Sequence, residues 1–432
     1  MKSYRRVLLS LIVSTLGTAS NIFMGNNIPE DNYRNDGTDV VNMVLYAASN
    51  TAWSQSLQYV MNMANGTTTD TAEEKECFSQ LENWFDEKLA EVNETIVSYG
   101  DTDKKNQIFD NLDWAANLVA VHKLYFDLNA TDEYFGYDGS HTAELKLRHK
   151  NSEKFWNRTD PNGFLDLHDV NLLAMHGSDL QDDSVMILLF KEIYYSMTGV
   201  WLENSQAKQN LDLIRNDIQT YFPGGFQNPL LTANAFASGS WTGPHDVIII
   251  GDGILQFIDD LNLTRDGSDF IHAHEYGHQL QFVTSTGFDV DYDNYTSIEE
   301  TRRAELMADA YGTYYLAHND GGDMAPEHIM ELHGVAFAAG GCPIFDDDWL
   351  GGITDHGTPE QRACAARWGA SVAVASKTDI MNPESFADLF DLTLPHILDL
   401  DERTCQLVLW NSTHENNGNS TDNINGGKRY LR

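Results

Sequence analysis

Residues 270–282, Phe-Ile-His-Ala-His-Glu-Tyr-Gly-His-Gln-Leu-Gln-Phe, contain the pattern His-Glu-x-x-His at His274, Glu275 and His278. Residues four apart in an α-helix lie on one face, so His274 and His278 can present two imidazoles to one cation, with Glu275 beside them. This spacing is typical of a zinc-binding helix. Because the chain has 15 His, chance could produce the pattern, and a second feature is needed to support it.

A third metal ligand is predicted in residues 301–312, Thr-Arg-Arg-Ala-Glu-Leu-Met-Ala-Asp-Ala-Tyr-Gly. A catalytic zinc site uses three protein ligands and keeps one position open, so two histidines require one more donor. We prefer Glu305, because Asp309 follows it by one helical turn. From there Asp309 could accept a hydrogen bond from the outer nitrogen of a ligand histidine.

The surroundings of Glu305 support this choice. The two helices carry small residues that would let them approach closely around one ion. These small residues are Gly277, Ala308 and Gly312. Three other residues could supply the third ligand, but none has an Asp one helical turn away. These residues are Glu299, Glu300 and His318.

The same residues suggest hydrolytic chemistry. Zinc lowers the pKa of a bound water toward neutrality, and Glu275 could take the proton as the water attacks a carbonyl group and then protonate the leaving amine. The developing oxyanion needs a further donor. His356 is the first candidate for that donor and Tyr311 the second. His272 faces another side of the helix from His274, which favours a core or surface role for it.

The two zinc-site segments resemble the gluzincin peptidases, in particular the neutral zinc metallopeptidase family. Their sequences are His274-Glu-Tyr-Gly-His-Gln-Leu-Gln and Glu305-Leu-Met-Ala-Asp-Ala. Three more segments are similar to that family: Asn234-Ala-Phe-Ala, Ile250-Gly-Asp-Gly-Ile-Leu and His356-Gly-Thr-Pro-Glu-Gln-Arg362. The resemblance covers roughly residues 160–370, and Ala310 departs from it, since the family often has Cys there.

This resemblance implies zinc on His274, His278 and Glu305. It also implies that Glu275 is the catalytic base and that Asp309 is the outer partner of a ligand histidine.

Residues 289–300 could form a calcium loop. As in an EF-hand, oxygen donors occupy the first, third, fifth and twelfth positions. These donors are Asp289, Asp291, Asp293 and Glu300. Asn294 stands at the sixth position, where the EF-hand uses Gly, and Thr296 at the eighth, where an apolar residue is usual. The alternative is a solvated connecting loop.

The overall charge argues against nucleic acid as a partner. The 65 acidic and 27 basic residues give a formal net charge of −38 at pH 7. No cluster of Lys and Arg beyond residue 10 could follow a phosphate backbone.

The first 20 residues predict a secretory signal peptide. Basic residues come first, an apolar run follows over residues 7–16, and small residues end the segment. A signal anchor is the alternative. No later stretch approaches the length of a membrane span, so we expect a secreted protein. Eight Asn-x-Thr sequons predict a glycoprotein, and they are Asn65, Asn93, Asn129, Asn157, Asn262, Asn294, Asn411 and Asn419.

The four cysteines are expected to form disulfides in an oxidising compartment. They are Cys77, Cys342, Cys364 and Cys405. Three pairings are possible. We favour Cys342 with Cys364 and Cys77 with Cys405, because the first pair closes a short loop. Unpaired buried thiols are the alternative.

The expected fold class is α+β and predominantly helical: a zincin-like metallopeptidase domain with an active-site helix and a small sheet. A helical region at 21–150 precedes the peptidase-like domain at 151–405, and a flexible polar tail follows at 406–432. The β-branched run in residues 246–253, closed by glycines, predicts a buried strand. The strand lies just upstream of the predicted zinc helix, which is the arrangement needed if its edge is to hold an extended peptide.

The sequence therefore predicts a secreted zinc metallopeptidase, an endopeptidase rather than an exopeptidase, that acts on a peptide or protein. The alternative is a catalytically silent zinc-binding extracellular glycoprotein. Glu275 argues against that alternative, because a pure binding site has no use for a base beside the metal. A third possibility is a calcium-stabilised surface glycoprotein whose zinc motif is incidental.

Overall fold

The computed structural model describes residues 80–97, 102–126, 133–159, 170–239, 246–284, 298–340 and 356–406, together with Leu167 and Thr286. Several predictions from the sequence lie outside these residues: the signal segment, the residues after 406, and the calcium ligands Asp289, Asp291 and Asp293 with the side chain of Glu300.

A three-stranded sheet is formed by β1 (Asn171–Met175), β2 (Ala235–Ser238) and β3 (Val247–Gly251), in the order β1-β3-β2. Strand β1 runs parallel to β3, and β2 runs antiparallel to it. Every residue of β3 is buried, which agrees with its β-branched sequence and with cover on both faces. The predicted buried strand is therefore confirmed. Strands β1 and β2 occupy both of its sides, so a peptide cannot add to an edge of β3.

Helices make up most of the described chain. In chain order they are α4 (Gln80–Val97), α5 (Thr102–Phe126), α6 (Thr142–Asn157), α7 (Asp183–Thr198), α8 (Asn204–Tyr221), α9 (Asp252–Asp260), α10 (Thr264–Thr284), α11 (Ile298–Ala317), α12 (Pro326–Ala338), α13 (Pro359–Ser376) and α14 (Pro383–Leu398). Short 3-10 turns are η2 (Gly177–Gln181), η3 (Gly225–Gln227) and η4 (Pro229–Leu231). A predominantly helical α+β fold with a small sheet is thus confirmed.

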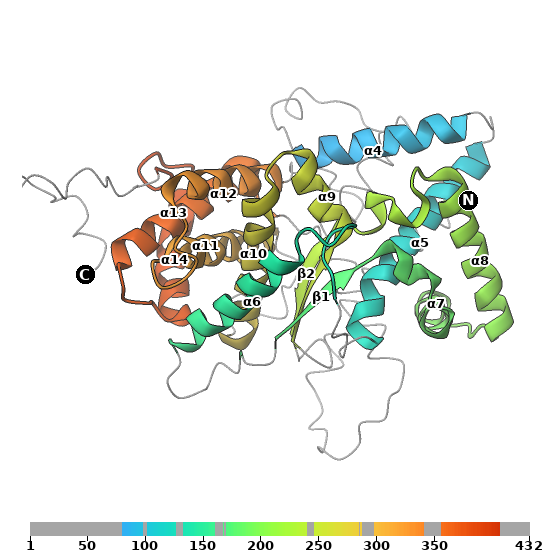
Figure 1. Cartoon of the computed structure of the whole chain (residues 1–432), viewed down its shortest axis with the longest axis horizontal. Helices are drawn as coiled ribbons and strands as arrows, with labels where there is room; N and C mark the ends of the chain where they lie inside the picture. Colours follow the sequence, from blue (N-terminus) through green and yellow to red (C-terminus); the bar gives the residue numbers. More distant parts are fainter. Residues whose placement is uncertain are drawn as a thin grey trace, which may run out of the picture.

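The sheet lies between two groups of helices (Figure 1). Helices α11 to α14 gather with α10 on the side of the C-terminus, and α5, α7 and α8 lie on the other side. Helix α10 contacts β2, α6 and α11. The predicted zinc helix is therefore held between the sheet and the C-terminal helices.

One hydrophobic core runs through both groups of helices. It includes Phe85 and Val92 of α4, Leu118 of α5 and Leu306 of α11. Helix α6 continues through residue 150, where the sequence predicted a domain boundary. That division stays a prediction.

The favoured cysteine pairing is wrong, because Cys364 forms its disulfide with Cys405. Cys364 lies near the start of α13, and α14 packs against α13. The chain that leaves α14 therefore returns to the beginning of α13, and the two Cα atoms lie 4.5 Å apart. Loop length along the sequence did not reveal this return. Cys77 and Cys342 lie outside the described residues.

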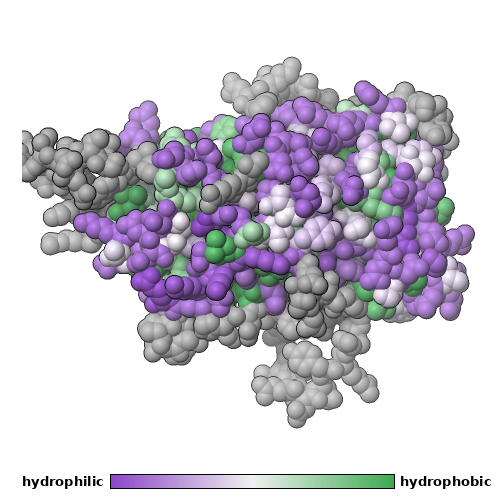
Figure 2. All heavy atoms as spheres, in the orientation of Figure 1, coloured by the Kyte–Doolittle hydropathy of each residue, from purple (hydrophilic) through white to green (hydrophobic). Residues whose placement is uncertain are grey.

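The surface of the described residues is largely hydrophilic on the face that Figure 2 shows, with small hydrophobic patches between polar side chains. None of the helices described here combines the length and the apolar character needed to cross a membrane.

Candidate metal centre

Helices α10 and α11 approach closely because small residues line their contact. A Cβ atom added to Gly277 would lie 3.0 Å from both the Cα and the carbonyl oxygen of Ala308. A Cβ added to Gly312 would lie 3.0 Å from the backbone nitrogen of His274. Larger side chains would force the helices apart, so the predicted role of these small residues is confirmed.

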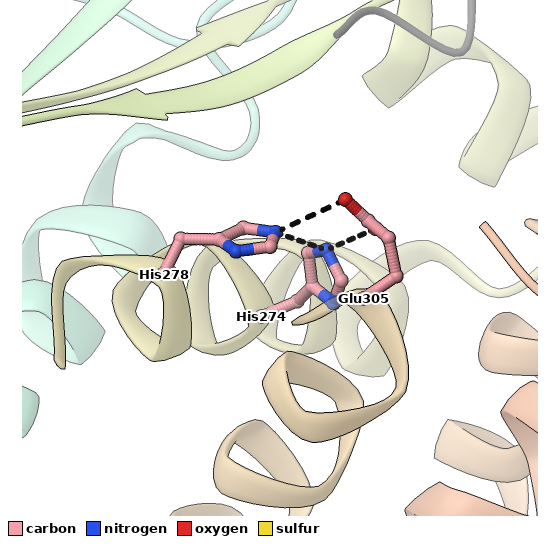
Figure 3. Close-up of side chains that lie close together, drawn as sticks. All are labelled: His274, His278 and Glu305. Carbon is pink, nitrogen blue, oxygen red and sulfur yellow. Dashed lines mark hydrogen bonds and ion pairs between the residues drawn. The ribbon is translucent and has the colours of Figure 1, made fainter. Parts of the chain in front are cut away.

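This approach brings His274, His278 and Glu305 together, as Figure 3 shows. The Nε2 atoms of the two histidines lie 3.2 Å apart. Glu305 places one carboxylate oxygen 3.4 Å from Nε2 of His274 and the other 3.5 Å from Nε2 of His278. The three side chains are between 9 and 13% exposed. Three donor atoms of the types that zinc binds thus face one point.

The outer nitrogen of His274 is held by a buried ion pair. Its Nδ1 donates to Oδ1 of Asp309 over 2.8 Å. Arg362 in turn donates from Nε and Nη2 to the two oxygens of Asp309, over 2.8 and 2.7 Å. Asp309 is fully buried, and Arg362 holds its pKa below the usual range even though burial raises it. Nδ1 of His274 is therefore held protonated, and Nε2 is the nitrogen that faces the cluster.

Local sequence places Arg362 at that point. Thr358 caps α13, its hydroxyl accepting from the backbone N–H of Gln361, and Gln361 accepts in return from the N–H of Thr358. Pro359 occupies the first helical position. This capping box begins α13 just before Arg362, whose Nη1 also donates to the carbonyl oxygen of Ala339 at the end of α12.

The outer nitrogen of His278 is held by a neutral amide. Nε2 of Gln281 donates to the carbonyl oxygen of Ala304 over 2.7 Å, so its Oε1 faces His278. Nδ1 of His278 donates to that oxygen over 2.9 Å. Its Nε2 lone pair is consequently directed at the cluster, toward Nε2 of His274.

The charges favour a cation between these groups. Burial lowers the pKa of His278 to about 4, so this imidazole is neutral near neutrality. Burial also lowers the pKa of His274, but the bonds to Asp309 and Glu305 outweigh burial and raise it to about 10. The pKa of Glu305 is well below its usual value, because His356, His278 and His274 together outweigh the effect of burial. His274 is thus an imidazolium near neutrality. A cation bound between these groups would take the place of its Nε2 proton, so one carboxylate and two Nε2 atoms converge on a position that holds positive charge.

Glu275 lies on the same helix and is 6% exposed. Burial raises its pKa to about 7, although His274 and the backbone N–H of Ala237 in β2 lower it. A carboxyl group with a pKa near neutrality can both take up and release a proton, as a general base requires.

The two candidates for the oxyanion donor are in different places. Nε2 of His356 lies 3.9 Å from Oε1 of Glu305, so the structure places it beside the cluster. Tyr311 is buried among the C-terminal helices, where its hydroxyl donates to the carbonyl oxygen of Pro383 and its ring stacks on Phe386. The structure therefore does not bring Tyr311 to the cluster, and its predicted role as oxyanion donor is wrong.

Other histidines lie away from the cluster. His272 is fully buried beside His149, with Nε2 of His272 3.0 Å from Nδ1 of His149, which agrees with the expected core role. His318, an alternative ligand, packs against Phe155 and Tyr314.

Sequence reasoning missed Arg362 and Gln281. Arg362 was noted only within a segment that resembles a peptidase family, and nothing in its spacing indicated that it would reach Asp309. Gln281 stands three residues after His278, on the same face of the helix, and that spacing could have revealed it.

Comparisons with protein-family models, with curated proteins and with solved structures gave no match to this chain. The functional argument therefore depends on the cluster of donor atoms and its surroundings.

Proposed function

We propose that the chain is a zinc-dependent peptidase with a zincin-like active site. The observation that carries this proposal is the convergence of His274, His278 and Glu305 with Glu275 beside them. The donor set fits Zn²⁺, because two imidazole nitrogens and one carboxylate are a usual combination of catalytic zinc ligands. The outer partners of both histidines direct their Nε2 atoms toward the position that the ion would occupy.

Zn²⁺ bound there supplies a Lewis acid that polarises a carbonyl group and lowers the pKa of water. Glu275 removes a proton from the attacking water as the new carbon–oxygen bond forms. It delivers the proton to the amide nitrogen as the carbon–nitrogen bond breaks. Its buried position keeps the exchanged proton from bulk water. His356, beside Glu305, is the donor that we assign to the developing oxyanion.

Strand β2 supports an extended peptide as the substrate. In the described part of the chain β2 pairs with β3 alone, and it packs against α10. The N–H of Ala237 interacts with Glu275, so the strand lies next to the proposed base. A peptide added along this strand would pass the base with both ends free, which favours an endopeptidase.

Secretion and glycosylation form part of the same proposal. They rest on the signal-like residues 1–20 and on the Asn-x-Thr sequons. The disulfide between Cys364 and Cys405 supports them, because such bonds persist in oxidising compartments.

The proposal is tested with the variant Glu275→Gln, which keeps the size of the side chain and removes the base. We expect cleavage of an unfolded protein to fall by about 10²–10⁴-fold, the usual contribution of a general base, with bound zinc unchanged. Glu327→Gln makes the same chemical change at an exposed position of α12 and should retain activity.

The decisive contrary result is a wild-type chain that binds zinc through Glu305 but cleaves no member of a broad peptide library. The catalytically silent zinc-binding glycoprotein would then be the correct description.

A further inference from the structure

A second group of metal-ligating side chains lies at the start of α10. Asp266 is in the first turn of that helix, about two turns before His274. His328 and Glu331 come from α12. The ligand atoms of these three residues lie within 4.8 Å of one another, and Nδ1 of His328 is 2.6 Å from Oδ2 of Asp266.

Acidic side chains surround the single imidazole of this group. Asp266 is 4% exposed, and the carboxyl group of Glu331 makes a side-chain hydrogen bond with it. Two carboxyl groups in contact repel each other when both are ionised. The groups that act on His328 are Asp266, Glu331 and Glu327, and all three are acidic. Because two hydrogen-bonded carboxyl groups share a proton, a divalent cation could displace that proton and neutralise both carboxylates of Asp266 and Glu331.

The donor types and their spacing fit a transition-metal ion. His328 and Glu331 are three residues apart in α12, so they lie on one face of that helix. One imidazole nitrogen and two carboxylate oxygens suit Zn²⁺ better than Ca²⁺ or Mg²⁺, which prefer oxygen alone. The side chain of His328 is 45% exposed, which leaves an open side for water as a fourth ligand.

We propose that Asp266, His328 and Glu331 form a second zinc site that clamps the start of α12 to the first turn of α10. The end of α12 is held separately, where the carbonyl oxygen of Ala339 accepts from Arg362. Arg362 also holds Asp309, the partner of His274. With the clamp at one end and Arg362 at the other, α12 braces the helix that carries the buried cluster. The role is structural, and it does not depend on peptidase activity.

The test counts zinc ions bound by the full chain after equilibrium dialysis against Zn²⁺. The wild type should bind about two ions, and His328→Ala/Glu331→Gln and Glu305→Ala should each bind about one, since each removes ligands from one site. Combining all three substitutions should leave none. A wild type with a single ion that Glu305→Ala removes would overturn the second site, as would a double variant that keeps both ions.

A matched control removes one glutamate carboxylate and one imidazole outside both proposed sites. Glu384→Gln/His396→Ala changes exposed side chains of α14, and it should keep both ions. Loss of an ion in this control would overturn the assignment of ligands.

A second measurement guards against misfolding of the double variant. Zinc should raise the thermal midpoint of Glu305→Ala, which retains the proposed clamp, and should not raise that of the triple variant. Equal shifts in both would overturn the clamp. If Glu305→Ala keeps both ions, the proposed function is contradicted. If His328→Ala/Glu331→Gln keeps both ions, only the clamp is contradicted.

Discussion

The two ligand clusters on α10 contain the same kinds of donor but differ in what stands behind them. In the buried cluster, both histidines donate their outer N–H to a fixed acceptor, Asp309 or Gln281, and those acceptors are themselves held by Arg362 and Ala304. In the cluster at the first turn, His328 uses its Nδ1 to contact Asp266 directly and is half exposed.

This difference teaches that donor identity alone does not set the quality of a metal site. Outer hydrogen bonds decide which imidazole nitrogen faces the ion, and they keep the ligands in place. We therefore expect tight zinc binding and chemistry at the buried cluster, and weaker, structural binding at the first turn of α10.

The largest expected effect is the loss of zinc from the buried cluster in Glu305→Ala. Removing a direct ligand should weaken that site by more than about a hundredfold, which is the upper range for loss of an outer partner. Glu300→Ala should keep the ion, because Glu305 is the carboxylate that lies with the two histidines. A competition titration with a chelator measures both affinities. Equal losses in the two variants would remove the distinction between the alternative ligands.

The extent to which sequence predicted this site follows from the range of each interaction. His274, Glu275 and His278 belong to one helix, and Glu305 and Asp309 to another, so helical spacing places each set on one face. Arg362 reaches Asp309 from a third helix, 53 residues further on, and no spacing rule covers such a distance. The pairing of Cys364 with Cys405 failed to be predicted for the same reason, since it depends on how α14 packs on α13.

The sheet shows the same limit. The composition of β3 predicted a buried strand, because β-branched residues suit a covered pleated surface. Its neighbours could not be predicted, since β1 begins 76 residues before the β3 residue with which it pairs, Asn171 opposite Val247. The edge that a peptide could use therefore moved from β3 to β2.

The next effect compares the two outer partners within the buried cluster. Asp309→Asn should lower zinc affinity by about 10–100-fold, because it removes the carboxylate behind His274. Gln281→Leu should lower it less, since a neutral amide stabilises the imidazole less than a carboxylate does. Chelator competition measures the two values. A greater loss in Gln281→Leu would show that the buried ion pair with Arg362 adds nothing to the site.

A smaller effect concerns the contact between α10 and α11. Gly277→Ala should destabilise the fold by about 1–3 kcal/mol, because the new methyl group meets the backbone of Ala308. Gly334→Ala is the matched control on α12. A Cβ there meets nothing within 4 Å, so helix propensity should make it stabilising by up to about 1 kcal/mol. Urea unfolding measures the change in the free energy of unfolding for both variants. Changes of the same sign in the two variants would contradict close packing at Gly277.

The smallest effect concerns a third imidazole–carboxylate pair, which lies at the ends of β1 and β3. Nδ1 of His176 is 2.7 Å from Oδ2 of Asp252. Burial lowers the pKa of His176, but Asp252 outweighs burial and raises it above the usual value. A raised pKa in the folded state stabilises the fold fully below the unfolded pKa of about 6.5, and this contribution is lost as pH rises through the folded pKa.

His176→Gln should therefore destabilise the protein more at about pH 6 than at an alkaline pH above the folded-state pKa of His176, where the wild-type imidazole has lost its proton. Urea unfolding of both proteins at the two pH values, with a chelator present, measures the difference. If His176→Gln lowers the free energy of unfolding by the same amount at both pH values, His176 is neutral in the folded state. A short imidazole–carboxylate distance would then not imply a charged pair in this protein, and the charge argument for His328 beside Asp266 would lose its support from this comparison.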